Sequence, residues 1–317
     1  MSHPAPFSPE KTFRSYTHEQ GAKYAQRRPS YHPNLYQTII DHHTSTGGQL
    51  DILLDVGCGP GTAVRGLAPH FTHAVGLDPS EGMISTARSL GGVASTSEPI
   101  RFDVSTAEDL GQHLSPPILN ASVDLITAST AAHWFDMSRF WPRAAQVLKP
   151  GGTVALWTGR SLRVHPSMPN YAAIQAAIDE HKERHLKAYF EPGNLLTQSL
   201  YADLPLPWTL EPPVPEFDET TFFRKEWGNG GTSATDNKFF VGEQTMNLET
   251  LGKRLETGSS VTRWRDAHPD AVGTEHDVVR ILIREIERLL HEAGVEKGKE
   301  VVKGGPMGVL LMVKKRV

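Results

Sequence analysis

Residues 51–61 read Asp-Ile-Leu-Leu-Asp-Val-Gly-Cys-Gly-Pro-Gly, an apolar run that ends in three closely spaced glycines. The run 52–56 is typical of a short strand that is buried on both faces. The glycines allow a sharp turn and a close approach of the backbone to a ligand, because no Cβ intervenes. The segment therefore predicts a buried strand that leads directly into a ligand-binding turn.

Strands and helices are predicted to alternate after this turn. The strands are apolar runs, which lie at 52–56, 73–77, 100–104, 123–128, 153–157, 217–227 and 308–313. Helical patterns lie at 33–43, 62–70, 81–90, 137–148, 170–188 and 276–291. This order of elements predicts an α/β fold, with a doubly wound, mostly parallel, seven-stranded sheet and helical cap insertions.

The chain is predicted to divide into four regions, according to where the alternation of strands and helices begins and where it ends. Residues 1–48 are predicted to form an N-terminal arm and cap helices, with 1–12 as a flexible arm. Residues 49–159 form the ligand-binding core. Residues 160–275 form a capping insertion that includes the strand at 217–227 and a loop at 229–233. Residues 276–317 supply the last amphipathic helix and the last strand.

The composition excludes several classes of protein. The 32 basic and 36 acidic residues give a net charge of −4, which argues against nucleic acid or an anionic membrane as a partner. The single cysteine excludes an internal disulfide and a multi-cysteine zinc site. No metal site is predicted, and His42 and His43 are interpreted as surface residues. No apolar run approaches the roughly 18 residues of a membrane span, and no secretory signal is visible, so the expected location is the cytoplasm.

An acidic residue completes a candidate nucleoside site. Asp78 ends the second predicted strand, 21 residues after Gly57, and a carboxylate in this position can accept both hydroxyls of a ribose. The dinucleotide fingerprint requires a glycine or alanine where this chain has Thr62, which argues against a dinucleotide. A phosphate-binding P-loop is excluded, because no Gly-Lys-Ser/Thr follows the turn.

Four segments together resemble the motifs of class I S-adenosylmethionine-dependent methyltransferases. Residues 55–61 resemble motif I, 76–84 resemble motif II, 107–110 resemble the segment whose acidic side chain meets the adenine, and 148–152 match the signature before the fifth strand. The resemblance implies S-adenosyl-L-methionine as the cofactor. It also implies a set of cofactor contacts: Arg28, Asp55, Gly57, Cys58, Gly59, Gly61, Asp78, Pro79, Met83, Ala107, Glu108 and Ser129.

Within that set, the resemblance gives particular roles to six residues. Asp55, Gly57 and Gly59 would line the methionine part of the cofactor, Asp78 would hold the ribose, Met83 would pack on the ribose or adenine, and Glu108 would face the adenine amine. Asp103 and Asp109 lie close to Glu108 in the sequence and remain alternatives for the last role.

Three further segments resemble trans-aconitate methyltransferase-like proteins: Tyr-Ala-Gln-Arg-Arg-Pro-Ser-Tyr at 24–31, Ser-Thr-Ala-Ala-His-Trp-Phe-Asp at 129–136, and Ser-Ser-Val-Thr-Arg-Trp at 259–264. This resemblance implies O-methylation of a carboxylate on a small di- or tricarboxylic acid. Alternatives are O-, N- or S-methylation of a secondary metabolite, and a cofactor-binding regulator without turnover. The sequence fits a monomer or a homodimer.

The chemistry of the acceptor decides which residues are needed. A carboxylic acid, with a reference pKa of about 4, is already an anion at neutral pH and requires cationic binders, whereas a hydroxyl requires a base. His133 and Trp134 are the predicted catalytic residues, because they follow the fourth strand at the ligand-binding edge of the sheet. The predicted acceptor contacts are these two residues with Tyr24, Arg27, Tyr31, Arg160, Arg224 and Arg263.

Overall fold

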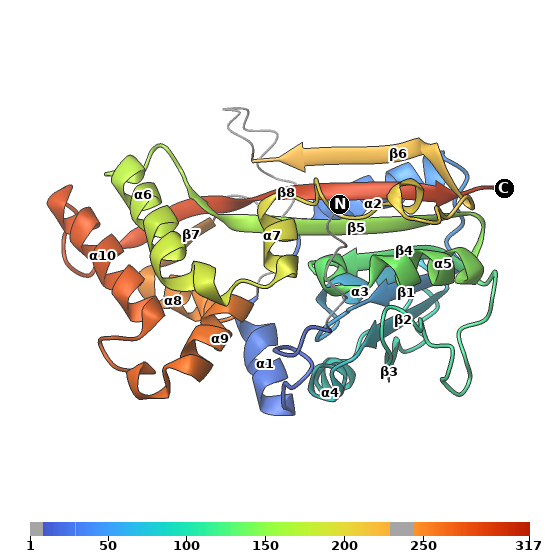
Figure 1. Ribbon diagram of the computed structural model, residues 1–317, viewed down its shortest axis with the longest axis horizontal. Coiled ribbons are helices and arrows are strands. Elements are labelled where there is room, and N and C mark those ends of the chain that lie inside the picture. The colour runs from blue at the N-terminus through green and yellow to red at the C-terminus, as the bar shows by residue number, and fades with distance from the viewer. Residues whose placement is uncertain (1–8, 29, 229–243) are drawn as a thin grey trace.

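The computed structural model describes residues 9–28, 30–228 and 244–317. One sheet runs through the molecule, in the order β3-β2-β1-β4-β5-β8-β6 (Figure 1). The parallel strands are β1 (Ile52–Val56), β2 (His73–Asp78), β3 (Arg101–Val104), β4 (Val123–Ser129) and β5 (Leu148–Val164). The reversal of strand order beside β1 is that of a doubly wound sheet, so the predicted Rossmann-like fold class is confirmed.

The remaining strands are antiparallel. They are β6 (Phe217–Trp227), β7 (Gln244–Asn247) and β8 (Val301–Lys315). β8 pairs with β5 and β6, and the short β7, which the sequence pattern did not predict, pairs with the first residues of β8. The predicted strands at 153–157 and 308–313 lie within the longer strands β5 and β8. Both strands continue well beyond the parallel sheet as a long ribbon (Figure 1).

Helices cover both faces of the parallel sheet. On one face, α2 (Pro33–Ser45), α3 (Thr62–Leu67) and α4 (Glu81–Leu90) contribute buried residues such as Ile39, Leu67 and Ile84 to one apolar cluster. On the other face, α5 (Met137–Val147) contributes Phe140 and Trp141 to a second cluster. Apolar strands enclosed on both sides in this way explain the uninterrupted hydrophobic runs of the sequence.

The far end of the β5–β8 ribbon carries a separate group of helices. These are α6 (Tyr171–His181), α8 (Leu248–Leu255), α9 (Ser259–Ala267) and α10 (Val278–Glu292), and α7 (Pro192–Gln198) lies between this group and the parallel sheet (Figure 1). Ile174, Leu251 and Ile286 pack with Val302 in their own apolar cluster. None of the described helices is long and apolar enough to span a membrane.

His43 is a core residue, so its interpretation as a surface residue was wrong. Its side chain is fully buried, its Nδ1 lies 2.7 Å from Thr153 Oγ1, and its Nε2 lies 2.8 Å from the Gln49 carbonyl oxygen. Burial lowers the pKa of this imidazole. The helical period contains the signal, because His43 follows Ile39 by four residues on the buried face of α2.

The described part of the segment that precedes α1 (His18–Arg27) begins within the predicted arm, at residue 9, and places one buried side chain there. The Glu10 carboxylate is buried and accepts hydrogen bonds from the Thr12 and Phe13 N–H groups. The Phe13 ring packs on Tyr16 and Tyr24. Residues 1–8 and the predicted loop at 229–233 lie outside the described residues.

Close contact of this segment with α4 depends on Gly82. A Cβ at this position would lie 2.0 Å from the Tyr16 carbonyl oxygen and 2.6 Å from the Thr17 carbonyl carbon, both of them backbone atoms. We expect Gly82→Ala to displace the segment before α1 and to lower the free energy of unfolding by about 1–3 kcal/mol, as measured by urea denaturation. Ser85→Ala, on the same helix, is the control and should stay within about 0.5 kcal/mol of the wild type. Equal stability of the two variants would contradict the steric argument.

Candidate functional site

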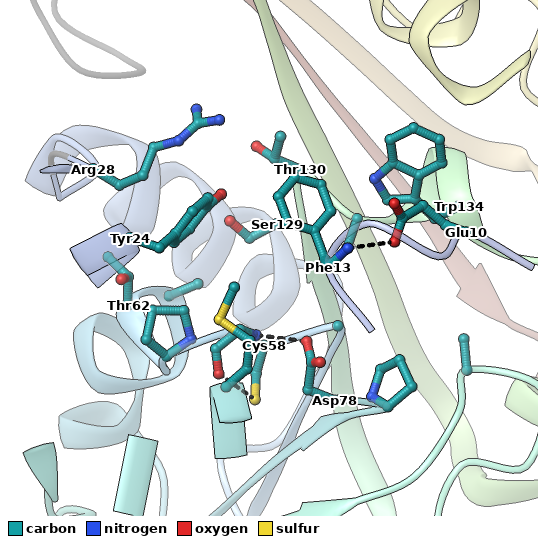
Figure 2. A pocket seen from close by; sticks show the side chains of 18 of the residues that line it. Glu10, Phe13, Tyr24, Arg28, Cys58, Thr62, Asp78, Ser129, Thr130 and Trp134 are labelled. Carbon is teal, nitrogen blue, oxygen red and sulfur yellow. Dashed lines mark hydrogen bonds between the residues drawn. The ribbon is translucent and has the colours of Figure 1, made fainter. Parts of the chain in front are cut away.

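A pocket opens where the parallel strands end. Its walls come from the turns after β1, β2 and β4 and from α1 with the segment before it (Figure 2). Residues of β5 and α8 complete the walls. The empty space inside it, with its open mouth, is about 1340 Å³. The pocket therefore lies at the carboxyl edge of the sheet beside the reversal of strand order, where doubly wound folds bind their ligands.

Most of the predicted site residues line this pocket. From the predicted cofactor set, these are Arg28, Gly57, Cys58, Gly59, Asp78, Pro79, Met83, Ala107, Glu108 and Ser129. From the predicted acceptor set, they are Tyr24, Tyr31, Trp134 and Arg160. Figure 2 shows Arg28 and Tyr24 on one side of the pocket, and Glu10 and Trp134 on the other.

The glycine turn leaves space for a ligand above its backbone. Gly59 has a φ of 53°, in the left-handed region that favours glycine, and an added Cβ would meet nothing within 4 Å. Gly57, with a φ of 63°, lies so close to the next turn that its Cβ would be 2.6 Å from the Ala131 Cβ. Gly59 thus borders open pocket space, and Gly57 allows the two turns to pack closely.

Asp78 connects the turns that follow β1 and β2. Its Oδ2 accepts a hydrogen bond from the Gly59 N–H at 2.9 Å, and its Oδ1 accepts one from the Ser80 N–H at 2.9 Å. Desolvation raises the pKa of this carboxyl to about 6, against the lowering effect of those two hydrogen bonds. Each oxygen keeps acceptor capacity, so the carboxylate can bind two adjacent hydroxyls.

Asp55 and Gly61 do not line the pocket, although both belong to the predicted cofactor set. Asp55 is fully buried beneath the turn, where Thr127 Oγ1 donates to its Oδ1. Its Oδ2 has no hydrogen-bond partner in the described part of the chain, and desolvation raises its pKa to about 7. Gly61 faces away from the pocket, toward Arg65 and Phe102. Both residues therefore lie beneath the pocket, where they support the turn.

Glu108 lines the pocket, whereas the two alternative carboxylates do not. Its Oε1 accepts a hydrogen bond from the Asp136 N–H at 2.9 Å, which fixes the direction of the side chain. Asp103 is paired with Arg101, and Asp109 interacts with Thr106. Of the three carboxylates, Glu108 is therefore the one placed to reach a ligand.

Three hydroxyls meet in the wall formed by the segment between α1 and α2 and by the end of β4. Ser129 Oγ donates to Tyr31 Oη, which also lies 3.2 Å from Thr130 Oγ1. Beside them the Arg28 guanidinium lies over the Tyr24 ring, 5.2 Å from its centroid. The Arg28 Nε is buried and has no hydrogen-bond partner in the described chain. This wall thus combines hydroxyls with a cation that is incompletely paired.

His133 lies behind Trp134 and does not line the pocket. Its Nδ1 lies 3.0 Å from Tyr201 Oη in a buried pair. Desolvation, with a further contribution from the Arg28 charge, lowers the pKa of this imidazole to about 3. A base with so low a pKa takes up a proton poorly at neutral pH. The geometry gives Trp134 a place in the pocket wall, and His133 a place behind it.

Three of the predicted acceptor arginines are engaged elsewhere and do not line the pocket. Arg27 forms an ion pair with Glu256, and Arg224 forms one with Glu226. Arg263 donates to the Tyr189 carbonyl oxygen and to Asn194 Oδ1, and it lies 3.4 Å from Glu191. Their guanidinium groups hold the capping segments together, so direct contact with an acceptor is not supported for Arg27, Arg224 or Arg263.

Besides Arg14, which precedes α1, the sequence reasoning missed a second pocket arginine, Arg254 of α8. It donates to Gln244 Oε1 at 2.8 Å and contacts Met246 Sδ, and no acidic side chain in the described chain pairs with it. Desolvation, and then the Arg28 charge, lower its pKa to about 10. No motif surrounds this residue, because the antiparallel β7–β8 pairing and the packing of α8 bring it to the pocket from far along the chain.

Other residues missed by the sequence reasoning come from the segment before α1 and from the turns. Glu10, Phe13 and Arg14 line the pocket because that segment is folded over it. The remaining additions lie next to predicted residues and could have been included by adjacency: Pro60, Thr62, Ala63, Thr130, Ala131, Phe135 and Gly159. Pro306 of β8 completes the lining.

Comparison with known proteins agrees with this geometry. Residues 54–156 match the family model of a methyltransferase domain. Over 274 residues, the chain is 24% identical to a Saccharomyces cerevisiae protein named as a probable S-adenosylmethionine-dependent methyltransferase, covering 86% of this chain and 88% of the relative. The protein is an S-adenosylmethionine-dependent methyltransferase, and its fold is that of the class I methyltransferases.

Two other methyltransferases match a shorter part of the chain. A methyltransferase of Aspergillus candidus is 31% identical over 54% of this chain and 50% of its own length. A malonyl-[acyl-carrier protein] O-methyltransferase of Dechloromonas aromatica is 32% identical over 45% of this chain and 47% of its own length. A solved structure from Anaeromyxobacter dehalogenans, proposed to be a type II methyltransferase, is 24% identical with a TM-score of 0.57, and it covers 91% of this chain and 97% of its own. That likeness supports the fold.

The pocket fits S-adenosyl-L-methionine, the cofactor of this methyltransferase. Asp78 can accept the two ribose hydroxyls, the space above Gly59 can hold the ligand close to the backbone, and Glu108, which lines the pocket, is available to the adenine. At the opposite end, Arg28 supplies a cation for a carboxylate. The pocket thus offers hydrogen-bond acceptors for the ribose hydroxyls of the cofactor and a cation for its carboxylate.

Asp78 gives the sharpest test of the cofactor site. We expect Asp78→Ala to weaken S-adenosylmethionine binding at least tenfold in isothermal titration calorimetry, because two charge-assisted hydrogen bonds to the ribose are lost. Asp103→Ala removes a carboxylate of the neighbouring strand that lies outside the pocket, and it should leave the affinity within twofold. An unchanged affinity in Asp78→Ala would refute the ribose assignment.

Proposed function

We propose that this methyltransferase transfers the methyl group to a carboxylate oxygen of a small di- or tricarboxylic acid. The observation that carries the proposal is Arg254, a largely buried cation that lines the pocket without an acidic partner in the described chain. Arg160 and Arg28 line the same pocket. An acceptor with more than one carboxylate would supply the missing negative charge.

The electrostatic argument starts from the cost of burying a cation. A buried charge costs several kcal/mol unless it is paired. Within the described part of the chain, the side chains that Arg254 contacts through hydrogen bonds are a neutral amide and a thioether. The charge of Arg28 raises that cost further, since it lowers the pKa of Arg254. Guanidinium groups bind carboxylates through two parallel hydrogen bonds. Anionic ligands in this pocket would thus relieve the repulsion between the arginines.

We divide three of the four pocket arginines between the two ligands by their position, and Arg14, which precedes α1, is not part of this assignment. Arg28, at the end of α1 beside the hydroxyls of Tyr31 and Ser129, faces the carboxylate of the cofactor. The acceptor is faced by Arg160 of β5 and by Arg254 of α8. Two arginines for the acceptor fit a molecule with two or more carboxylates better than a monoacid.

A carboxylate acceptor also fits the absence of an effective base among the predicted catalytic residues. The cofactor supplies an electrophilic methyl group on its sulfonium. A carboxylic acid is ionised at neutral pH, so the protein's task is to hold the acceptor oxygen in line with that carbon and to keep water out. Trp134 and Phe135 form an apolar wall for this purpose, with Tyr24 opposite. His133 remains neutral behind Trp134.

The remaining features of the proposal follow from the composition and one relative. One related protein carries the name of a malonyl-[acyl-carrier protein] O-methyltransferase, and a malonyl group bears a free carboxylate.

The net charge of −4 favours a free small molecule as the acceptor rather than nucleic acid or a membrane. The single cysteine is consistent with a reducing compartment such as the cytoplasm. Either a monomer or a homodimer would suffice for this reaction.

The decisive experiment combines a panel of acceptors with an arginine variant. The protein is incubated with methyl-labelled S-adenosylmethionine and with di- and tricarboxylic acids, phenols and thiols, and the product is tested for the base lability of a methyl ester. We expect esters of the acids, and we expect Arg254→Gln to raise the acceptor KM at least tenfold, with cofactor affinity within twofold. Arg224→Gln removes an arginine outside the pocket and should change neither constant.

Several outcomes would count against the proposal. Transfer only to phenols or thiols would exclude carboxylates as acceptors. An unaltered KM in Arg254→Gln would show that the buried cation does not bind the acceptor. Cofactor binding without transfer to any acceptor in the panel would favour a regulatory protein.

His133 provides a separate prediction on pH. Because its pKa is about 3, the imidazole should stay neutral throughout the range from pH 6 to 9, and turnover of a dicarboxylic acid should show no ionisation of this group there. His133→Asn keeps a polar atom near Tyr201 and should change kcat less than about threefold, whereas loss of a general base costs about 100-fold or more. A 100-fold decrease in kcat, or a changed pH profile, would restore His133 as a base.

A further inference from the structure

A second pocket lies behind the cofactor pocket, between α1, α3 and α4. We call it the Arg65 groove. Its described lining residues are His18, Ala22, Ala25, Gln26, Arg28, Ser30, Tyr36, Thr62, Arg65, Gly66, Thr86, Ser89 and Leu90. Arg28 and Thr62 also line the cofactor pocket, so the two cavities share a wall.

The Arg65 groove is positively charged. Arg28 and Arg65 enter it from different elements, the end of α1 and the middle of α3, and the described lining residues include no Asp or Glu. Side chains that can donate hydrogen bonds surround the two cations, among them Gln26, Ser30 and Ser89. The lining therefore offers charge and donors to an anion but no acidic side chain to compensate the arginines.

Neither arginine is fully compensated by the protein itself. The Arg65 Nη1 and the Arg28 Nε are buried without hydrogen-bond partners in the described chain. Desolvation lowers the pKa of Arg65, and the nearby Asp55 opposes this only weakly. Asp55 is itself an incomplete counter-charge, because its own pKa is raised to about 7. Two arginines that line one cavity, with no acidic residue in its described lining, leave a positive charge that an anionic ligand can offset.

We infer that the Arg65 groove binds a phosphate group between Arg65 and Arg28. A phosphate presents several oxygens in different directions, which can accept from a guanidinium on each wall and from the hydroxyl and amide donors between them. Arg28 would then be shared between this anion and the carboxylate of the cofactor. Because one guanidinium cannot serve both anions fully, phosphate in the groove weakens the binding of S-adenosylmethionine.

The first experiment measures binding of inorganic phosphate to the full chain by isothermal titration calorimetry, with sodium chloride used to keep the ionic strength constant. We expect binding in the wild type and at least tenfold weaker binding in Arg65→Gln. Arg88→Gln is the matched control, because Arg88 lies on the adjacent α4 outside the groove and pairs with Asp103. It should bind phosphate as the wild type does.

A second variant separates the groove from the acceptor side of the cofactor pocket. Phosphate that bound among the acceptor arginines would be lost in Arg254→Gln and retained in Arg65→Gln, and that result would overturn the inference. Arg65→Lys keeps the charge without the forked donor geometry, and it should bind more weakly than the wild type but more tightly than Arg65→Gln. It also covers the case in which Arg65→Gln does not fold, since equal binding by Arg65→Lys and the wild type would then count against the inference.

The coupling is tested by measuring the Kd for S-adenosylmethionine with and without saturating phosphate, again at constant ionic strength. In the wild type, the Kd with phosphate should be about two to ten times the Kd without it. In Arg65→Gln the two Kd values should be about equal. A ratio that is the same in both proteins would overturn the shared role of Arg28. Glycerol phosphate in a parallel titration distinguishes a phosphate ester from the free ion as the ligand, and binding of either one that depends on Arg65 supports the site. None of these measurements requires the proposed carboxylate acceptor.

Discussion

One buried carboxylate connects the parts of the cofactor site. Asp78 accepts from the backbone N–H groups of Gly59 and Ser80, so it fixes the turn after β1 relative to the turn after β2. Asp78 also lines the pocket, where we expect it to bind the ribose of the cofactor. Because desolvation disfavours the ionised form, the carboxylate depends on these donors and on the ligand's hydroxyls for its stability. The architecture of the site and the recognition of the cofactor therefore rest on the same atoms.

The sequence predicted those parts of the molecule that depend on local pattern. The strand at 52–56, the glycine turn and Asp78 follow one another within a few elements, and parallel strands place their carboxyl ends at one edge of the sheet. Arg254 and Glu10 were not predictable in this way. Each reaches the pocket through pairing or packing with segments far along the chain, and no periodicity or spacing near either residue indicates that contact.

The arginines illustrate the limit of reasoning from residue type alone. A guanidinium suits a carboxylate ligand and a carboxylate side chain equally well, so sequence cannot tell which partner an arginine meets. In the structure Arg27 and Arg263 bind the protein's own acidic and carbonyl groups, whereas Arg254 has neutral partners in the described part of the chain. These arginines differ in whether the fold brings an acidic side chain or a backbone carbonyl group next to the guanidinium. His133 follows the same logic, because burial beside Tyr201 changes a typical base into a neutral core residue.

The long β5–β8 ribbon carries the capping helices on an apolar cluster of their own, apart from the two clusters that pack on the parallel sheet. Arg254 belongs to this outlying unit, whereas Asp78 and the glycine turn belong to the sheet. Side chains on the ribbon's helices can thus be exchanged without repacking the layer that binds the cofactor. For protein engineering, the ribbon is a natural junction at which a different cap could be grafted to redirect the same methyl donor to another acceptor.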